Sequence, residues 1–470
     1  MNENVSPNYE SSSHSGKPEA IIDIDAAPSI DSPIKRRKLL RKIDSRVLPA
    51  LIVVYFLAFL DRVNIGNALI YKLPQDLNLQ GLQTNIALCV FFVGYIVCEI
   101  PANILMKKTK PHIFLSASMF CFGLLTILQG FVHNFGGLVT TRLLLGVAEA
   151  GVYPGSFYII SMWYKRSEAQ RRCSLFLTAV SISAAFGGLL ASAIGKMDGV
   201  RGYSAWRWIF ILEGLLTCVV SFGAFFTVTD FPECATFLNE SERAYVIERL
   251  AADQGSSGHE VRITFSAVID TFKDWKMIPA GLMYFGVTTS GYALAYFIPS
   301  IVSTYHYSPI RSQLFSVPPW AATMVYALLI AYLSDKFRNR SAFILIGLCL
   351  AVTGNVVLLT VHDYQKVQYA GLILYAMGIF STVPIIICWF TMNLRGHKNR
   401  AVGAAWQIAV GNIGCIVAIF SFPSRDAPRY VRGYSLGLGC MGLTVLMGTA
   451  YFVGCLRENR RGMHEPRLLL

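Results

Sequence analysis

Twelve long apolar stretches dominate this sequence of 470 residues and constrain its fold more than any other feature. A helix needs about 20 consecutive apolar residues to cross the hydrocarbon core of a bilayer. We therefore expect an all-α integral membrane protein with twelve transmembrane helices. The expected spans are 47–68, 83–106, 112–132, 136–161, 173–195 and 206–229, followed by 276–303, 312–334, 341–361, 367–392, 400–422 and 433–456.

The composition agrees with an apolar solvent. Hydrophobic residues make up 54% of the chain and charged residues only 15%, whereas a soluble domain carries about 25% charged residues. The mean hydropathy is +0.48. The first 46 residues are polar, so we expect no cleavable signal peptide and expect the first span to act as the insertion signal.

The net charge of +13 is explained by membrane topology rather than by nucleic-acid binding. If the N-terminus is cytoplasmic, 30 of the 41 Lys and Arg residues lie on the cytoplasmic side. This bias predicts that both termini are cytoplasmic, by the positive-inside rule. The "KRRKLLRK" segment has a second interpretation, as a localisation signal or a lipid-contacting patch.

Six spans precede the longest loop and six follow it, which is the arrangement of two six-helix bundles with a substrate site between them. We expect a disordered cytoplasmic tail over 1–46 and an N-terminal bundle over 47–230. A cytoplasmic linker over 231–275, a C-terminal bundle over 276–456 and a second cytoplasmic tail over 457–470 would complete the chain.

Few ionisable residues lie well inside the expected spans, and they gather in the first half. They are Asp61, Arg62, Glu99, Arg142, Glu149 and Glu213. Each costs roughly 2.5–3.5 kcal/mol at mid-bilayer on insertion scales, so each should face the protein interior and find a partner.

Helix geometry limits which of these charges can pair. Asp61 and Arg62 are adjacent and point about 100° apart, while Arg142 and Glu149 are separated by about 10 Å along one face. We expect Arg142 to pair with Asp61 between spans one and four, which leaves Arg62 for an anion and Glu149 for a proton. The alternative is a static charge cluster that only locks helices together.

Small residues should allow spans to approach closely near these charges. In "GVAEAGVYPG", Gly146, Gly151 and Gly155 lie at helical spacing, which is typical of tight helix packing in membranes. Pro154 predicts a kink in the same span.

The residue types indicate a chemistry. Burial opposes the charge of a carboxylate and a nearby arginine favours it, so Asp61 or Glu149 can bind and release protons. Arg62 presents a planar fork that suits a carboxylate. Together they predict proton-coupled movement of a small organic anion across the lipid bilayer, with no cofactor other than the proton gradient.

The sequence contains no pattern that is typical of an enzyme active site or a metal site. The 11 cysteines include no CxxC pair, the histidines are scattered at loops and span ends, and no Gly-rich phosphate loop follows a strand. We expect no metal site and no catalytic residues.

Four segments in order resemble one known family. "YFLAFLDRVNIGNA", "FFVGYIVCEIPANILMKK", "RLLLGVAEAGVYPG" and "AWRWIFILEG" are similar to the anion:cation symporter family of the major facilitator superfamily. The resemblance is strongest to its fungal branch of allantoate, nicotinic acid, pantothenate and biotin permeases, and covers roughly residues 40–460. It implies the major facilitator fold.

The resemblance also implies roles for individual residues. Arg62 would engage the substrate carboxylate, Asp61 and Glu149 would carry protons, and Arg142 would partner them. Three further substrate-binding candidates are Tyr95 before Pro101, and Gln407 and Asn412 in "WQIAVGNIG". Tyr95 has an alternative role in packing.

The superfamily's inner-gate loop is matched in part. In "AYLSDKFRNRS", Asp335, Lys336 and Arg338 fit its pattern, whereas the equivalent first-half loop "NILMKKTKPH" keeps only basic residues. An inner-gate salt bridge is therefore in doubt in the first half.

We expect a proton-coupled symporter that functions as a monomer in the plasma membrane, with an internal membrane as the alternative address. A uniporter or exchanger of the same fold and a nutrient sensor without flux are the alternative functions. An aromatic wall suited to a flat ring would come from Trp389, Trp406, Tyr292, Tyr296 and Phe297, unless these residues serve only helix packing.

Overall fold

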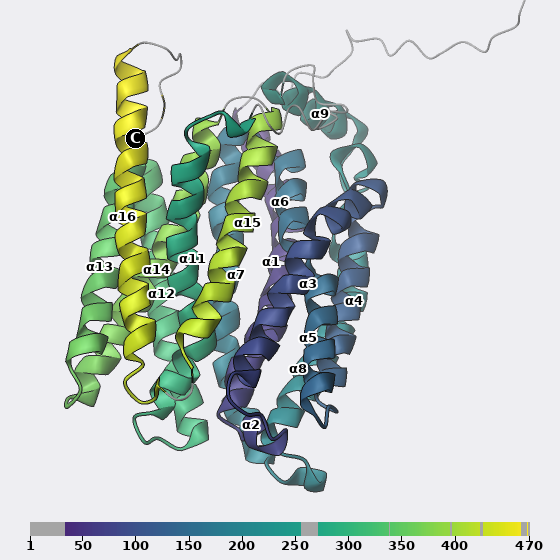
Figure 1. Ribbon diagram of the computed structural model, residues 1–470. Coiled ribbons are helices and arrows are strands. Elements are labelled where there is room, and N and C mark those ends of the chain that lie inside the picture. Colours follow the sequence, from purple (N-terminus) through teal and green to yellow (C-terminus); the bar gives the residue numbers. More distant parts are fainter. Residues whose placement is uncertain are drawn as a thin grey trace, which may run out of the picture.

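The computed structural model describes residues 33–254, 271–337, 339–394, 397–423, 426–461 and 468, and within these ranges every regular element is a helix (Figure 1). Twelve helical stretches of this described part are long and apolar enough to cross a membrane, which confirms the predicted fold class. The membrane helices and the short α2 of the first half are α1 (Pro33–Leu69), α2 (Leu73–Asp76), α3 (Gln83–Lys108), α4 (Pro111–Gln129), α5 (Phe135–Glu149), α6 (Val152–Trp163), α7 (Arg166–Ile194) and α8 (Ala205–Thr227). After α9 (Glu240–Gln254), the second half contains α11 (Met277–Ser303), α12 (Pro309–Phe337), α13 (Arg340–Thr360), α14 (Gln365–Asn393), α15 (His397–Ser421) and α16 (Val431–Arg460).

The helices form two bundles side by side, with α1 to α8 in one and α11 to α16 in the other (Figure 1). Across the boundary α1 packs on α11, α3 on α15 and α7 on α12. Helix α9 lies at one end of the bundles and α2 at the opposite end (Figure 1). We refer to these as the α9 end and the α2 end.

The fourth span is interrupted where the sequence predicts a kink. Helix α5 ends at Glu149 and α6 begins at Val152. Pro154 has no backbone N–H to donate to the carbonyl of residue 150, so the helical ladder is broken there. The break places Glu149 at the end of α5, in the middle of the span.

The predicted close approach at Gly146 is confirmed. A Cβ atom on Gly146 would lie 2.1 Å from the carbonyl oxygen of Phe91 on α3, and one on Gly151 would lie 2.5 Å from the ring of Phe114 on α4. Only glycine allows these helices to pack so closely. The contact fixes α5, and with it Arg142 and Glu149, against the neighbouring helices.

The prediction of a disordered tail over 1–46 is wrong for its last part. Helix α1 begins at Pro33, and Leu39, Ile43 and Val47 are buried along one of its faces. Their spacing of four residues is that of an amphipathic helix, which the many basic residues between them obscure. Residues 1–32 lie outside the described part.

Candidate functional site

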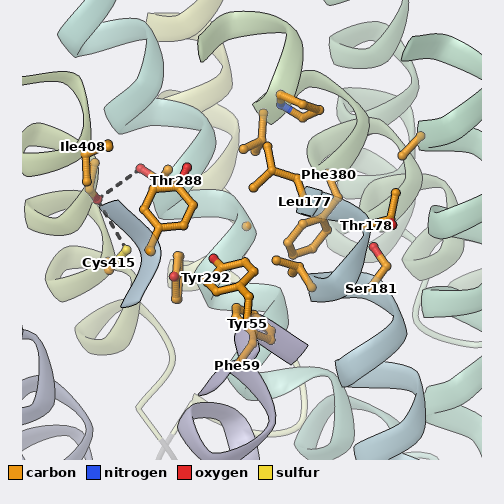
Figure 2. A pocket seen from close by; sticks show the side chains of 18 of the residues that line it. Tyr55, Phe59, Leu177, Thr178, Ser181, Thr288, Tyr292, Phe380, Ile408 and Cys415 are labelled. Carbon is orange, nitrogen blue, oxygen red and sulfur yellow. Dashed lines mark hydrogen bonds between the residues drawn. The ribbon is translucent and has the colours of Figure 1, made fainter. Parts of the chain in front are cut away.

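A pocket lies between the two bundles, lined by α1, α3, α6 and α7 on one side and by α11, α12, α14 and α15 on the other. Its walls are mostly apolar, with several aromatic rings and a few hydroxyl groups (Figure 2). The aromatic residues are Tyr55, Phe59, Tyr95, Tyr153, Tyr284, Tyr292 and Phe380, and the hydroxyl residues include Ser174, Thr178, Ser181 and Thr288. Among the described residues that line the pocket, only Arg62 is charged. A concave apolar site with a few polar groups is typical of small-molecule binding.

Arg62 is 3% exposed and makes bonds to both bundles. Its Nε and Nη2 donate to Oε2 of Glu149 at 3.0 and 2.7 Å, and its Nη1 donates to the hydroxyl of Tyr292 on α11 at 2.9 Å. Glu149 Oε1 has no hydrogen-bond partner within the described part of the chain. The guanidinium therefore holds one carboxylate oxygen, and the other is left unsatisfied.

Aromatic rings surround the same guanidinium. Its Cζ lies 5.1 Å from the ring centroids of both Phe91 and Tyr95 and 5.9 Å from that of Phe59. Cation–π contacts of this kind stabilise a charge where water is excluded. They stabilise the charge of Arg62 beside its ion pair with Glu149.

The expected pairing of Arg142 with Asp61 is wrong. Arg142 Nη1 donates to the main-chain carbonyl of Arg62 at 3.1 Å. With the Gln129 amide oxygen turned towards it, Arg142 also donates from Nε and Nη2 at 3.2 and 3.3 Å. The side chain of Arg62 reaches Glu149, whereas the main-chain carbonyl of Arg62 points along α1 to the level of Arg142. Arg142 lies seven residues before Glu149, which is about 10 Å along the axis of α5. Asp61 is rotated about 100° from Arg62, and its two carboxyl oxygens have no hydrogen-bond partner within the described part of the chain.

The predicted substrate-binding residues divide into two groups. Tyr95 and Asn412 line the pocket, and Asn412 Nδ2 has no partner among the described residues. Gln407 is fully buried away from the pocket, where its Nε2 donates to the carbonyl of Ala280 at 3.4 Å. Because residues five apart on a helix lie about 140° from each other, Gln407 and Asn412 cannot face the same cavity.

The predicted aromatic wall is largely wrong. Trp389 packs against Tyr451 with centroids 4.7 Å apart, Trp406 donates to the carbonyl of Met277, and Phe297 stacks on Phe422. Tyr292 lines the pocket, and the ring of Tyr296 lies 6.1 Å from that of Tyr292 without lining it. The other four residues pack between helices, as the alternative interpretation has it.

The wall that does form includes two residues that the sequence analysis missed. Tyr55 and Phe59 precede Arg62 by seven and three residues on α1 and line the pocket with it. The signal was available, because residues at this spacing share one helix face. Figure 2 shows both rings beside Tyr292, near the hydroxyl of Thr288 and the thiol of Cys415, which both donate to the Gly411 carbonyl.

The predicted inner-gate loop is described only in part. Lys336 is exposed at the end of α12, with its Nζ 5.9 Å from the ring centroid of Phe337. The side chain of Asp335 and the whole of Arg338 lie outside the described residues.

The two bundles close the α2 end of the pocket. Asn85 Nδ2 donates to the carbonyl of Ile419 at 2.6 Å, and Gln313 Nε2 donates to the carbonyl of Asn67 at 3.2 Å. A Cβ atom on Gly66 would lie 2.5 Å from the carbonyl oxygen of Tyr296.

The pocket extends in the other direction, towards the α9 end. Ser174 lies in the third turn of α7 and Ala331 lies two turns before the end of α12. These parts of the two helices are at the α9 end.

Comparison with known proteins identifies relatives over almost the whole chain. The family model described as Major Facilitator Superfamily matches residues 51–419. An uncharacterized transporter of Schizosaccharomyces pombe is 34% identical over 409 residues, which is 86% of this chain and 80% of the relative. The high-affinity nicotinic acid transporter of Saccharomyces cerevisiae is 30% identical over 438 residues, or 93% of this chain and 81% of the relative.

A solved structure has the same arrangement of helices. The bacterial homolog of the human lysosomal transporter Spinster, in an inward-facing and unoccupied conformation, superposes with a TM-score of 0.66. It covers 87% of this chain and 96% of its own, at 16% sequence identity. This similarity supports the two-bundle fold.

Proposed function

This chain belongs to the Major Facilitator Superfamily, and from that premise we propose that it carries a small organic anion together with a proton by alternating access. The superfamily makes it a membrane transporter rather than an enzyme. The nature of the cargo and the coupling to protons are our inference from the site.

The ion pair of Arg62 and Glu149 is the observation that carries the proposal. The pair is buried, and Arg62 lines the pocket. A substrate carboxylate can take the place of Glu149 on the guanidinium only if Glu149 is relieved of its charge, because an unpaired buried carboxylate is costly. A proton on Glu149 meets that need, so anion binding and proton binding favour each other.

The walls of the pocket favour a flat, partly apolar anion. Seven aromatic rings line the pocket, and offset or edge-to-face packing on such rings stabilises an aromatic ligand. Asn412 Nδ2 is an unused donor in the same wall. A relative is named for nicotinic acid, and nicotinate has the required carboxylate, planar ring and ring nitrogen. We therefore choose nicotinate as the first probe.

We infer the orientation of the chain in the membrane, and the state that the structure represents, from its charge distribution and from the closed end of the pocket. By the positive-inside rule the α9 end is cytoplasmic, and the bundles meet at the α2 end. We infer that the structure represents an inward-facing state of an uptake carrier of the plasma membrane, with both termini in the cytoplasm.

Uptake of radiolabelled nicotinate into proteoliposomes tests the proposal. An inward proton gradient should drive accumulation above the external concentration, and a protonophore should abolish it. Allantoate and pantothenate should be measured in parallel, because the aromatic pocket predicts a preference for nicotinate. Equal uptake with and without the gradient would indicate a uniporter or exchanger, and saturable binding without flux would indicate a sensor; either result overturns the symport proposal.

A further inference from the structure

A second, smaller cavity lies at the α2 end of the C-terminal bundle. It is formed where α11 and α13 end and where α14 and α16 begin, and the start of α16 can be seen at that end in Figure 1. The cavity has a volume of about 230 Å³, including the part open to solvent, compared with about 1040 Å³ for the pocket that contains Arg62. The two share no lining residue, so this cavity is a separate site.

The polar side chains that line this cavity include no acid within the described part of the chain. They are Thr304, Tyr305, His362, Gln368, Arg429 and Tyr434. The side chains of His362 and Arg429 form no hydrogen bond or ion pair with the described residues. Arginine offers five N–H donors and no acceptor, and its planar fork matches the oxygens of a carboxylate or a phosphate. The lining therefore favours an anion.

Two buried tyrosines bring unused hydroxyl groups to the same cavity. Tyr305, just after α11, is 7% exposed, and Tyr434, in the first turn of α16, is 3% exposed. Both line the cavity, and neither hydroxyl has a hydrogen-bond partner within the described part of the chain. The hydroxyl of a buried tyrosine usually finds a partner. A ligand with acceptor oxygens would supply that partner to both residues.

Backbone contacts hold these groups in place. Asn355 Nδ2 on α13 donates to the main-chain carbonyl of Tyr434 at 3.2 Å and so joins the start of α16 to α13. The N–H of Tyr430 donates to the carbonyl of Asp426 at 2.8 Å. This bond closes the turn that carries Arg429 to the mouth of the cavity. The donors are thus positioned before any ligand binds.

The helix ends add to the preference for an anion. Helices α14 and α16 begin at the cavity, and neither N-terminus has a side-chain cap, whereas helix N-termini attract negative charge. The carbonyls where α11 and α13 end are already bonded. Thr304 donates to the carbonyl of Ile301 from its N–H at 3.1 Å and from its hydroxyl at 2.7 Å. Gln368 Nε2 donates to the carbonyl of Val361 at 2.6 Å.

We propose that this cavity binds a small oxyanion, a carboxylate or a phosphate, through Arg429, Tyr305 and Tyr434. The guanidinium fork holds two oxygens of the anion, and the two hydroxyls donate to the same group. A free organic acid and inorganic phosphate share this chemistry. The bound anion joins the end of α11 to the start of α16. The site is separate from the proposed transport pocket and goes beyond the proposed function.

Modification of arginine by phenylglyoxal tests the site in the purified full-length protein. The reagent forms an adduct with an accessible guanidinium, and mass spectrometry gives the modified fraction of each arginine. Acetate, nicotinate and phosphate are titrated separately at constant ionic strength, with a bulky sulfonate as the balancing anion. At least one of the three should protect Arg429 in a saturable manner. Arg432 is exposed and outside the cavity, so it should stay unprotected and is the internal control.

The three anions distinguish the possible ligands. Protection by acetate or nicotinate alone assigns the site to carboxylates, protection by phosphate alone assigns it to phosphate, and protection by both kinds indicates a general oxyanion site. The absence of protection by all three overturns the proposal. Equal protection of Arg429 and Arg432 also overturns it, because that result would reflect charge screening rather than binding.

Two variants test the hydroxyl groups. Tyr305→Phe and Tyr434→Phe each remove a hydroxyl that makes no hydrogen bond with the described residues, so the fold should tolerate them. A hydrogen bond to a charged group corresponds to about tenfold or more in binding, so each variant should raise the anion concentration for half-protection of Arg429 at least about tenfold. Tyr364→Phe, 69% exposed and outside the cavity, is the matched control and should leave it unchanged.

Wild-type protection in both tyrosine variants would contradict the proposed site. The measurement requires neither flux nor a gradient, so it is independent of the transport assay. If nicotinate uptake is not driven by protons, the proposed function fails, and the protection of Arg429 still decides whether this cavity binds an anion.

Discussion

The hydroxyl of Tyr292 on α11 accepts a hydrogen bond from Nη1 of Arg62 on α1, at 2.9 Å. The guanidinium that holds Glu149 within the first bundle is thus also bonded to the second bundle. Any change in the charge partners of Arg62 therefore acts directly on the contact between the bundles. Such a link is what alternating access requires, because occupancy of the site must alter the relative position of the two halves.

Tyr292→Phe should weaken the closed α2 end. A hydrogen bond to a charged group contributes about 1.5–3 kcal/mol, so its loss should shift the equilibrium about 10- to 150-fold towards states in which the bundles separate there. Spin-label distances between α3 and α15 at the α2 end should show a larger open population. Tyr332→Phe, an exposed residue of α12, should leave the distance distribution as in wild type.

Arg62→Lys should reduce nicotinate uptake at least tenfold. Lysine keeps the charge but loses the planar fork through which Nε and Nη2 both reach one carboxylate, and one lost charged hydrogen bond corresponds to about tenfold or more. Initial uptake rates, divided by the amount of reconstituted protein, measure the effect. Arg201→Lys, an exposed residue, controls for the substitution type, and wild-type uptake by the Arg62 variant would remove Arg62 from the anion site.

Glu149→Gln should separate exchange from accumulation. The amide imitates a protonated carboxyl group, so Arg62 is free for the anion at every pH. Counterflow of nicotinate should therefore persist, while accumulation driven by a proton gradient should fall to the passive level. Glu240→Gln on the exposed start of α9 is the control. Gradient-driven accumulation in the Glu149 variant would contradict a coupling role for Glu149.

The fold could be predicted because the spans are encoded locally. A run of about 20 apolar residues specifies a membrane helix without reference to its neighbours, and all twelve are present. The start of α1 was missed because Leu39, Ile43 and Val47 are separated by basic residues. Their common face is evident only when the residues are placed on a helix with 3.6 residues per turn.

The pairing of charges could not be predicted, because it depends on helix rotation and on contacts between bundles. Asp61 and Arg62 are neighbours in sequence, yet one faces α8 and the other faces the pocket. Rotation also explains why Asn412 lines the pocket and Gln407 does not. Tyr292 was predicted as part of a wall, but its bond to Arg62 depends on how α1 and α11 pack.

Acidic pH should loosen the contact between α1 and α9. Lys42 Nζ donates to Glu242 Oε2 at 2.6 Å. Burial raises the pKa of Glu242, but the bonds from Lys42 and from the backbone N–H of Asn239 outweigh it and lower the pKa below its usual value. A lowered folded-state pKa means that the stabilisation is complete above the ordinary carboxyl range and is lost as pH falls through the lowered value.

Hydrogen exchange of α9 across this pH range measures that loss. After correction for the intrinsic rate, protection should fall at acidic pH in wild type. In Glu242→Gln it should be low throughout and independent of pH, because the charged partner of Lys42 is gone. Protection that stays constant in wild type would show that the contact does not hold α9.

Gly66→Ala should prevent full closure of the α2 end. The added Cβ atom would lie 2.5 Å from the carbonyl oxygen of Tyr296, and a backbone oxygen cannot move aside without moving α11. The bundles must then separate where α1 meets α11, so the variant should favour the state open at the α2 end and lose most of its uptake. Spin-label distances across that end should lengthen relative to wild type.

Gly223→Ala is the matched control for this substitution. Gly223 is on α8, and a Cβ atom there would have no neighbour within 4 Å, so the same chemical change should leave distances and uptake unaltered. If Gly66→Ala also gave wild-type distances and uptake, the contact of Gly66 with Tyr296 would not be part of the closed gate. A loss of uptake without any change in distance would likewise count against steric opening, because the mechanism requires that the two bundles move apart at this contact.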